Sequence, residues 1–135
     1  MTTYTISSAS KLMSANQQVK RIGQYLYRHI DGAYDYRSGP NSFDVYFVLL
    51  YELKPELREP DQDCPVEEMG INLNITTYQN KIRINITEIT PQERTIGSDV
   101  YSPEKVQDLN KAYSLIMGKI YRRICRAYED YHFMY

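Results

Sequence analysis

A chain of 135 residues can form one domain with a hydrophobic core, and 42% hydrophobic with 24% charged residues is a globular composition. The net charge of −1 argues against a protein that binds polyanions through its overall charge. No apolar run approaches the roughly 20 residues that span a bilayer, and the N-terminus lacks the basic and apolar segments of a signal peptide. We therefore expect one soluble, cytoplasmic α+β domain over residues 1–135.

The numbers of cysteines and tyrosines give further information on the kind of protein this is. Cys64 and Cys125 are too few for a disulfide framework, and we expect both as free thiols. The chain has 14 tyrosines against 3 phenylalanines and no tryptophan. Because tyrosine joins an apolar ring to a polar hydroxyl, it suits boundaries and contact surfaces better than a dry core. This composition favours a protein with an interaction surface.

The first predicted element is a helix that ends near Asp31. Ser8 or Ser10 can cap its N-terminus, and Gly32 stands where a C-terminal cap is expected. A loop over residues 33–42 follows. One helical stripe is apolar: Leu12, Val19, Ile22, Leu26 and Ile30.

Residues 43–53 predict a long strand that is apolar on both faces. If one face packs on the core, the other must be covered by the following loop or by a partner. The first face is formed by Phe43, Val45, Phe47, Leu49, Tyr51 and Leu53, and the second by Tyr46, Val48 and Leu50.

Residues 54–70 form a long acidic loop that contains three prolines. Its segment from Asp61 begins like a calcium-binding loop. Pro65 and Val66 stand at the fifth and sixth positions, however, and no glycine follows for the sharp bend. We expect no metal here, and we interpret the loop as a functional or mobile acidic flap.

Residues 71–89 predict a β-hairpin around which the rest of the chain is organised. Isoleucine and leucine alternate with polar residues on both sides of a turn at residues 78–81, where Asn80 suits a positive φ. A lone hairpin is marginal in water, so other elements must cover its apolar face.

The last predicted element is a second helix. Residues 90–101 form an extended connection, after which Ser102 caps the helix and Pro103 occupies its first position. A helix from there to Tyr131 would measure about 43 Å. A hairpin strand spans only about 25 Å, so we expect the helix to overhang the sheet at its C-terminal end.

This order of elements predicts an α+β fold, a two-layer α-β-β-β-α sandwich. It has a three-stranded antiparallel sheet with the two long helices on one face.

Two groups of residues are candidate binding surfaces. The first is an apolar line on the last helix that contacts either the first helix or a partner, together with the second face of the long strand. The second is a basic line interleaved with tyrosines, which is either a nucleic-acid surface or a solvated helix face favoured by the helix dipole. The partner-binding candidates are Tyr46, Val48, Leu50, Met117, Tyr121 and Tyr128, and the nucleic-acid candidates are Lys119, Arg122, Arg123 and Arg126.

Catalytic signals are weak throughout. His29 and His132 have no cysteine or carboxylate at ligand spacing, and no phosphate-binding loop or hydrolase motif is present. We expect no cofactor and no enzyme activity.

The predicted function is a non-enzymatic protein–protein interaction or assembly module that self-associates as a homodimer or larger, or binds another protein. This profile fits a small viral or accessory protein. The alternative is a nucleic-acid-binding protein that uses its basic, tyrosine-rich helices, and neither hypothesis involves a membrane.

Overall fold

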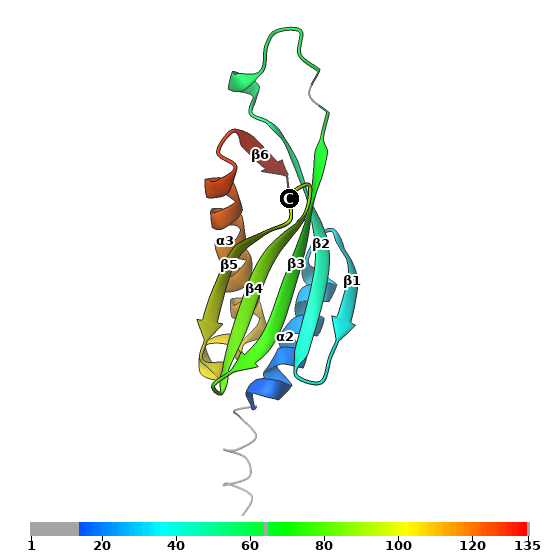
Figure 1. Cartoon of the computed structure of the whole chain (residues 1–135). Coiled ribbons are helices and arrows are strands. Elements are labelled where there is room, and N and C mark those ends of the chain that lie inside the picture. Colours follow the sequence, from blue (N-terminus) through cyan, green and yellow to red (C-terminus); the bar gives the residue numbers. More distant parts are fainter. Residues whose placement is uncertain (1–13, 64, 135) are drawn as a thin grey trace, which may run out of the picture.

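The computed structural model describes residues 14–63 and 65–134 of the chain. Helices α2 (Ala15–His29) and α3 (Leu109–Ala127) lie on one face of an antiparallel sheet, and none of these described residues covers the opposite face, which we call the uncovered face (Figure 1). This confirms an α+β fold with two helices. The buried side chains of the sheet and both helices form one hydrophobic core between the two layers.

The sheet is larger than predicted. Its first five strands are neighbours in chain order, and the sixth pairs with the second. The prediction of three strands was therefore wrong. The strands are β1 (Ala33–Ser38), β2 (Ser42–Leu53), β3 (Glu67–Tyr78), β4 (Lys81–Thr90), β5 (Arg94–Tyr101) and β6 (Tyr131–Met134).

The missed strands lack the apolar alternation that marks a half-buried strand. β1 is exposed at every residue after Ala33, so the segment reads as a loop. In β5 the register shifts where Ile86 and Thr87 pair with Gly97 and Thr95, which interrupts the period of two. β6 has only four residues.

The predicted hairpin is confirmed as β3 and β4. Leu73 pairs with Ile86 and Ile75 with Ile84, so the apolar side chains of both strands face the helices. The turn residues Gln79 and Asn80 have φ angles of 49° and 61°. Two consecutive positive φ values are typical of the type I′ turn, whose twist matches that of the strands.

Strand β2 has three strand neighbours because β1 and β6 share one of its edges. β1 pairs with β2 up to Phe47, whereas β6 pairs with it from Leu50 onward. Between them, Val48 N donates a hydrogen bond of 3.1 Å to Gly32 O. The other edge of β2 is occupied by β3 along its length. Phe133 of β6 is buried, so this last strand contributes a side chain to the core.

Helix α2 begins after Ser14, which forms a reciprocal capping box with Gln17. Ser8 and Ser10, the predicted caps, lie outside the described residues. Gly23 faces the sheet, where a Cβ atom would come within 2.2 Å of Phe43 Cδ1. Glycine is therefore needed for α2 to approach β2 this closely.

Helix α3 begins six residues later than predicted. Pro103 starts a short 3₁₀ helix, η2 (Pro103–Val106), and α3 follows its N-cap, Asp108. The Asp108 carboxylate accepts hydrogen bonds from the backbone N–H groups of Asn110 and Lys111. α3 is about 28 Å long, whereas the 12 residues of β2 span about 40 Å. The predicted overhang was wrong, because the sheet extends past the helix.

The acidic segment projects from the end of the sheet (Figure 1). It is shorter than predicted, because β3 already begins at Glu67. The 3₁₀ helix η1 (Pro55–Leu57) lies at its start. Lys54 N donates a hydrogen bond of 3.0 Å to Asp130 O, and Arg58 Nε donates one of 2.8 Å to Leu53 O. These contacts fix the base of the loop. We call residues 54–66 the apical loop.

Candidate interaction surface

The uncovered sheet face carries a row of hydrogen-bonded polar side chains across four strands. Asn74 Nδ2 donates to Asp44 Oδ1 at 2.9 Å, and Asn85 Nδ2 donates to Asn74 Oδ1 at 3.2 Å. Ser98 Oγ completes the row with a bond of 2.8 Å to Asn85 Oδ1. Cross-strand pairs of this kind stabilise a sheet. These groups are already partnered, so the row forms a polar region beside the apolar side chains of the same face.

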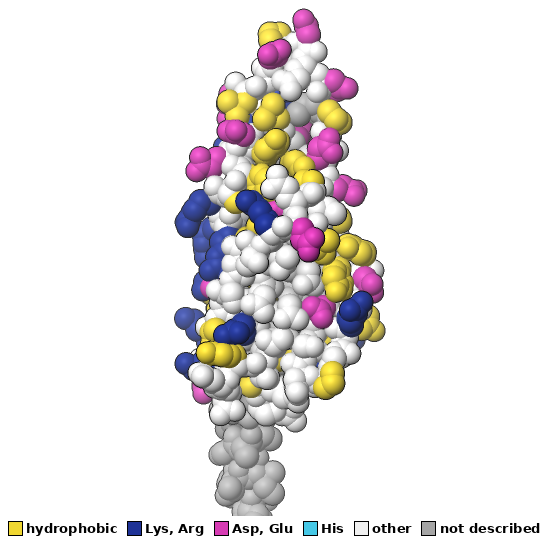
Figure 2. Space-filling view, viewed as in Figure 1, with side chains coloured by type: hydrophobic (Ala, Val, Ile, Leu, Met, Phe, Trp, Pro, Cys, Tyr) yellow, Lys and Arg dark blue, Asp and Glu magenta, His cyan; other side chains and the backbone are white. Residues whose placement is uncertain are grey.

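Four side chains on this face form what we call the β2 strip: Tyr34, Tyr46, Val48 and Leu50. The three strip residues of β2 are every second residue along the strand, so their side chains point to the same face of the sheet. The ring of Tyr34 lies 6.5 Å from that of Tyr46. Tyr34 is 58% exposed and Leu50 38%, whereas the other two are partly buried. Hydrophobic side chains lie along the margin over β1 and β2 (Figure 2).

Tyr34 was not predicted as a site residue because residues 33–42 were interpreted as a loop. The β1–β2 pairing shifts register between Ala33 and Asp35, so Tyr34 lies at an irregularity rather than in a regular alternating position. An irregular strand of this kind leaves no period-two pattern in the sequence.

The helix residues of the predicted partner surface lie within the fold. Met117 is 3% exposed and belongs to the core. Tyr121 and Tyr128 are partly buried and pack against the same core. The second apolar line of α3 therefore packs within the fold, and among the predicted apolar candidates the exposed one is Leu50 on β2.

Tyr128 belongs to a buried polar cluster at the end of β4. Glu88 is completely buried and accepts hydrogen bonds from Tyr128 OH at 2.5 Å, Arg94 Nε at 3.0 Å and Gln92 N at 3.1 Å. The Arg94 guanidinium also lies 4.6 Å from the centroid of the Tyr128 ring. Burial, and next the hydrogen bond to Glu88, raise the pKa of Tyr128 to about 12.

This cluster could have been detected in the sequence. Glu88 continues the period-two series of Ile82, Ile84 and Ile86, so it places a carboxylate on the apolar face of the hairpin. A buried carboxylate requires hydrogen-bonding partners. The two partner side chains come from β5 and from the residue that follows α3, so the cluster fastens the last turn of α3 to the sheet.

The four basic candidates on α3 fall into two pairs. Arg123 forms a bidentate ion pair with Asp99 of β5, with distances of 2.6 and 2.8 Å, and Lys119 Nζ lies 3.5 Å from the same carboxylate. Arg122 and Arg126 are exposed. Asp99 thus pairs with Lys119 and Arg123, whereas Arg122 and Arg126 form no ion pair with any described residue.

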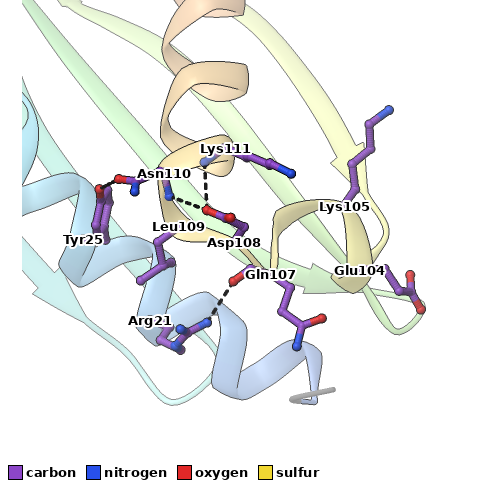
Figure 3. A pocket seen from close by; sticks show the side chains of 9 residues that line it. All are labelled: Arg21, Tyr25, Glu104, Lys105, Gln107, Asp108, Leu109, Asn110 and Lys111. Atoms are coloured by element: carbon purple, nitrogen blue, oxygen red, sulfur yellow. Dashed lines mark hydrogen bonds between the residues drawn. The ribbon is translucent and has the colours of Figure 1, made fainter. Parts of the chain in front are cut away.

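An open pocket of about 610 Å³ lies between α2 and the start of α3 (Figure 3). Tyr25 OH donates a hydrogen bond to Asn110 Oδ1, and Arg21 Nη1 donates one of 3.1 Å to Gln107 O. The side chain of Asp108 points back to its own helix terminus (Figure 3). These polar groups join the two helices to one another, so we interpret the pocket as the surface groove between the two packed helices.

Within residues 14–63 and 65–134, no three His, Cys, Asp or Glu side chains are grouped closely enough to hold a metal ion. Helices in this part of the chain lack the combination of length and apolar character that spanning a bilayer requires. Comparison of the chain with protein families, curated proteins and solved structures gives no match.

Proposed function

We propose that this chain is a non-enzymatic interaction and assembly module, and that two copies associate through the β2 strip. The observation that supports this proposal is the group of adjacent apolar side chains on the sheet face opposite to the two described helices. Covering such side chains removes apolar area from water and lowers the free energy. A contiguous apolar patch beside polar residues is typical of a protein-binding surface.

A second copy is the occupant that suits this surface. A two-fold axis can place the strip of one copy on the same strip of the other, as in most homodimers. The polar row next to the strip would lie at the rim of that contact. Its side chains are already hydrogen-bonded to one another, so little polar desolvation opposes association.

The test replaces the two most exposed members of the strip by a β-branched polar residue, in Tyr34→Thr/Leu50→Thr. Light scattering at high salt should give twice the chain mass of 15.9 kDa for the unmodified protein and the single mass for this variant. A monomeric unmodified protein, or a variant that stays dimeric, would contradict the proposal.

Val100→Thr is the matched control. Val100 lies on the uncovered face at the opposite side of the sheet and is 43% exposed, close to the value for Leu50. The control introduces the same polar residue at an exposed apolar position of the same face, so it should remain dimeric. If it also becomes monomeric, the contact covers the whole face and not the strip.

Nucleic-acid binding by α3 stays the alternative, favoured by the exposed pair Arg122 and Arg126. Binding of this kind would weaken steeply as salt rises, since phosphate contacts release counterions. The variant Arg122→Glu/Arg126→Glu tests it more cleanly than one that includes Arg123, whose removal would leave Asp99 without its strongest partner. Binding of a single-stranded or duplex oligonucleotide that this variant abolishes would favour the alternative.

A further inference from the structure

The helix layer is strongly basic. The two helices together contain eight Lys and Arg residues and no Asp or Glu. Two of these cations are held by Asp99. Lysine and arginine side chains gather along the margin over α3 and β5 (Figure 2). Four exposed cations form no ion pair with any residue that the structure describes: Arg28, Lys111, Arg122 and Arg126.

The apical loop and its flanks carry the opposite charge. Residues 52–68 contain seven Asp and Glu against two Lys and Arg, a net charge of −5. Among the described residues of this segment, Glu52 is the one carboxylate with an ion pair, to Arg58 at 3.2 Å. Acidic side chains surround this end of the molecule (Figure 2). The exposed carboxylates without an ion pair to any described residue are Glu56, Glu59, Asp61, Asp63, Glu67 and Glu68.

The apical loop is held away from the helices of its own subunit. The backbone bond from Lys54 to Asp130 and the two contacts of Arg58 fix its base. From there the loop extends beyond the sheet, away from both helices (Figure 1). Within one subunit, no ion pair joins the described carboxylates of the loop to the exposed cations of α3.

We propose that the exposed basic face of α3 binds the apical loop of a second copy. The partner is argued from charge complementarity. Each chain supplies one surface of each sign, and the two are matched within a molecule whose net charge is only −1. A polyanion such as nucleic acid would use only the basic surface of the chain and leave the acidic loop without a partner.

This contact is heterologous, since a loop meets a helix. Each copy then offers one loop and one helix face, and repetition of the contact produces a ring or an open chain of copies. This contact rests on the proposed self-association and adds a second, salt-sensitive contact to it. Salt can distinguish it from the contact through the β2 strip, because burial of apolar area is little affected by salt.

The test is a charge exchange between the two surfaces. In Glu59→Lys/Asp61→Lys two loop carboxylates become basic and the net charge of residues 52–68 changes from −5 to −1. In Arg122→Glu/Arg126→Glu the exposed arginine pair of α3 becomes acidic. Each variant alone brings like charges together and should weaken the contact by on the order of tenfold or more. An equimolar mixture restores opposite charges and should recover the association. Glu93→Lys/Glu104→Lys changes the net charge equally at exposed positions elsewhere, and should behave like the unmodified protein.

Sedimentation velocity between about 0.05 M and about 0.5 M NaCl separates the two contacts, because the Debye length falls from about 14 to about 4 Å over this range. The unmodified protein should form species larger than a dimer at low salt and only the dimer at high salt. Tyr34→Thr/Leu50→Thr should still associate at low salt, which distinguishes failure of the strip from failure of the charged contact.

Three results would overturn the inference. One is a mass of the unmodified protein that does not depend on salt. Another is a mixture of the two charge variants that stays as dissociated as each variant alone. The third is ultraviolet absorbance of bound nucleic acid that disappears in Arg122→Glu/Arg126→Glu, which would assign the basic face to a polyanion.

Discussion

The hydroxyl of Tyr128 donates a 2.5 Å hydrogen bond to Glu88 Oε1 and so fastens the end of α3 to the end of β4. Tyr128→Phe removes this bond and leaves the buried carboxylate with two donors, Arg94 Nε and Gln92 N. We expect the free energy of unfolding to fall by about 1–3 kcal/mol, because a hydrogen bond to a buried charged group is lost. Urea denaturation measures this change.

Tyr78→Phe is the control for that substitution. Tyr78 is 39% exposed, and its ring, which lies under the Arg83 guanidinium, is kept in phenylalanine. Its effect should stay within about 0.5 kcal/mol. Equal effects of the two substitutions would mean that the Tyr128 hydroxyl contributes nothing beyond its ring.

Four tyrosines should titrate above the ordinary pKa of 10, because burial raises the pKa of Tyr51 and Tyr113 as well as that of Tyr101 and Tyr128, and the last two are raised furthest. Burial, and next the charge of Asp99, raise the pKa of Tyr101 to about 12, and the pKa of Tyr128 is also about 12. Between pH 10 and 12 the folded chain therefore binds more protons than the unfolded chain. The free energy of unfolding should be unaffected by these groups below pH 10 and should fall as the pH rises through this window.

Tyrosinate absorbance during an alkaline titration measures the pKa values of the tyrosines directly. The signal of Tyr128→Phe should lose one late-titrating group and keep the one assigned to Tyr101. If all tyrosines titrate together near 10 while circular dichroism still reports a folded chain, the raised pKa values are wrong.

The two helical glycines should respond oppositely to alanine. At Gly23 a Cβ would lie 2.2 Å from Phe43 Cδ1, whereas at Gly118 the nearest atom is Arg122 Nη1 at 3.4 Å, the end of a flexible side chain. Gly118→Ala should stabilise by about 0.5–1 kcal/mol through helix propensity. Gly23→Ala should destabilise by about 1–3 kcal/mol through overpacking. Thermal unfolding of the pair would contradict this account if both midpoints moved the same way.

Two substitutions in the β3–β4 turn should make the chain more stable. Gln79 occupies a position with φ of 49°, which glutamine tolerates less well than asparagine. Gln79→Asn/Asn80→Gly creates the Asn-Gly pair that type I′ turns favour, and we expect a gain of about 0.5–1 kcal/mol. Denaturant unfolding should show a higher midpoint with an unchanged slope, and a lower midpoint would refute the turn assignment.

The regular elements were predictable from sequence, and the irregular ones were not. The hairpin follows from alternating isoleucines, and the core of α2 from the spacing of Val19, Ile22 and Leu26. The start of α3 was misplaced because Ser102 and Pro103 form a convincing start signal, which the structure uses for a 3₁₀ turn. β1 and β5 carry too few buried side chains to leave a periodic pattern.

The candidate surface was predicted in part. The two-faced composition of β2 indicated uncovered apolar residues, and Leu50 is exposed as that pattern implies. The same reasoning does not determine whether a second apolar line on a helix faces a neighbour or the core, and Met117 faces the core. The pairing of Arg123 with Asp99 depends on β5, which the sequence did not reveal.

Strand β6 completes an edge of β2 although more than half the chain separates the two in sequence. During synthesis on the ribosome, the backbone donors and acceptors of Leu50–Leu53 on that edge have no strand to pair with until residues 131–134 have been made. A nascent chain therefore exposes an unpaired strand edge for most of its elongation, and such edges are sites of misassembly. Chaperone dependence should accordingly be greatest before residues 131–134 emerge.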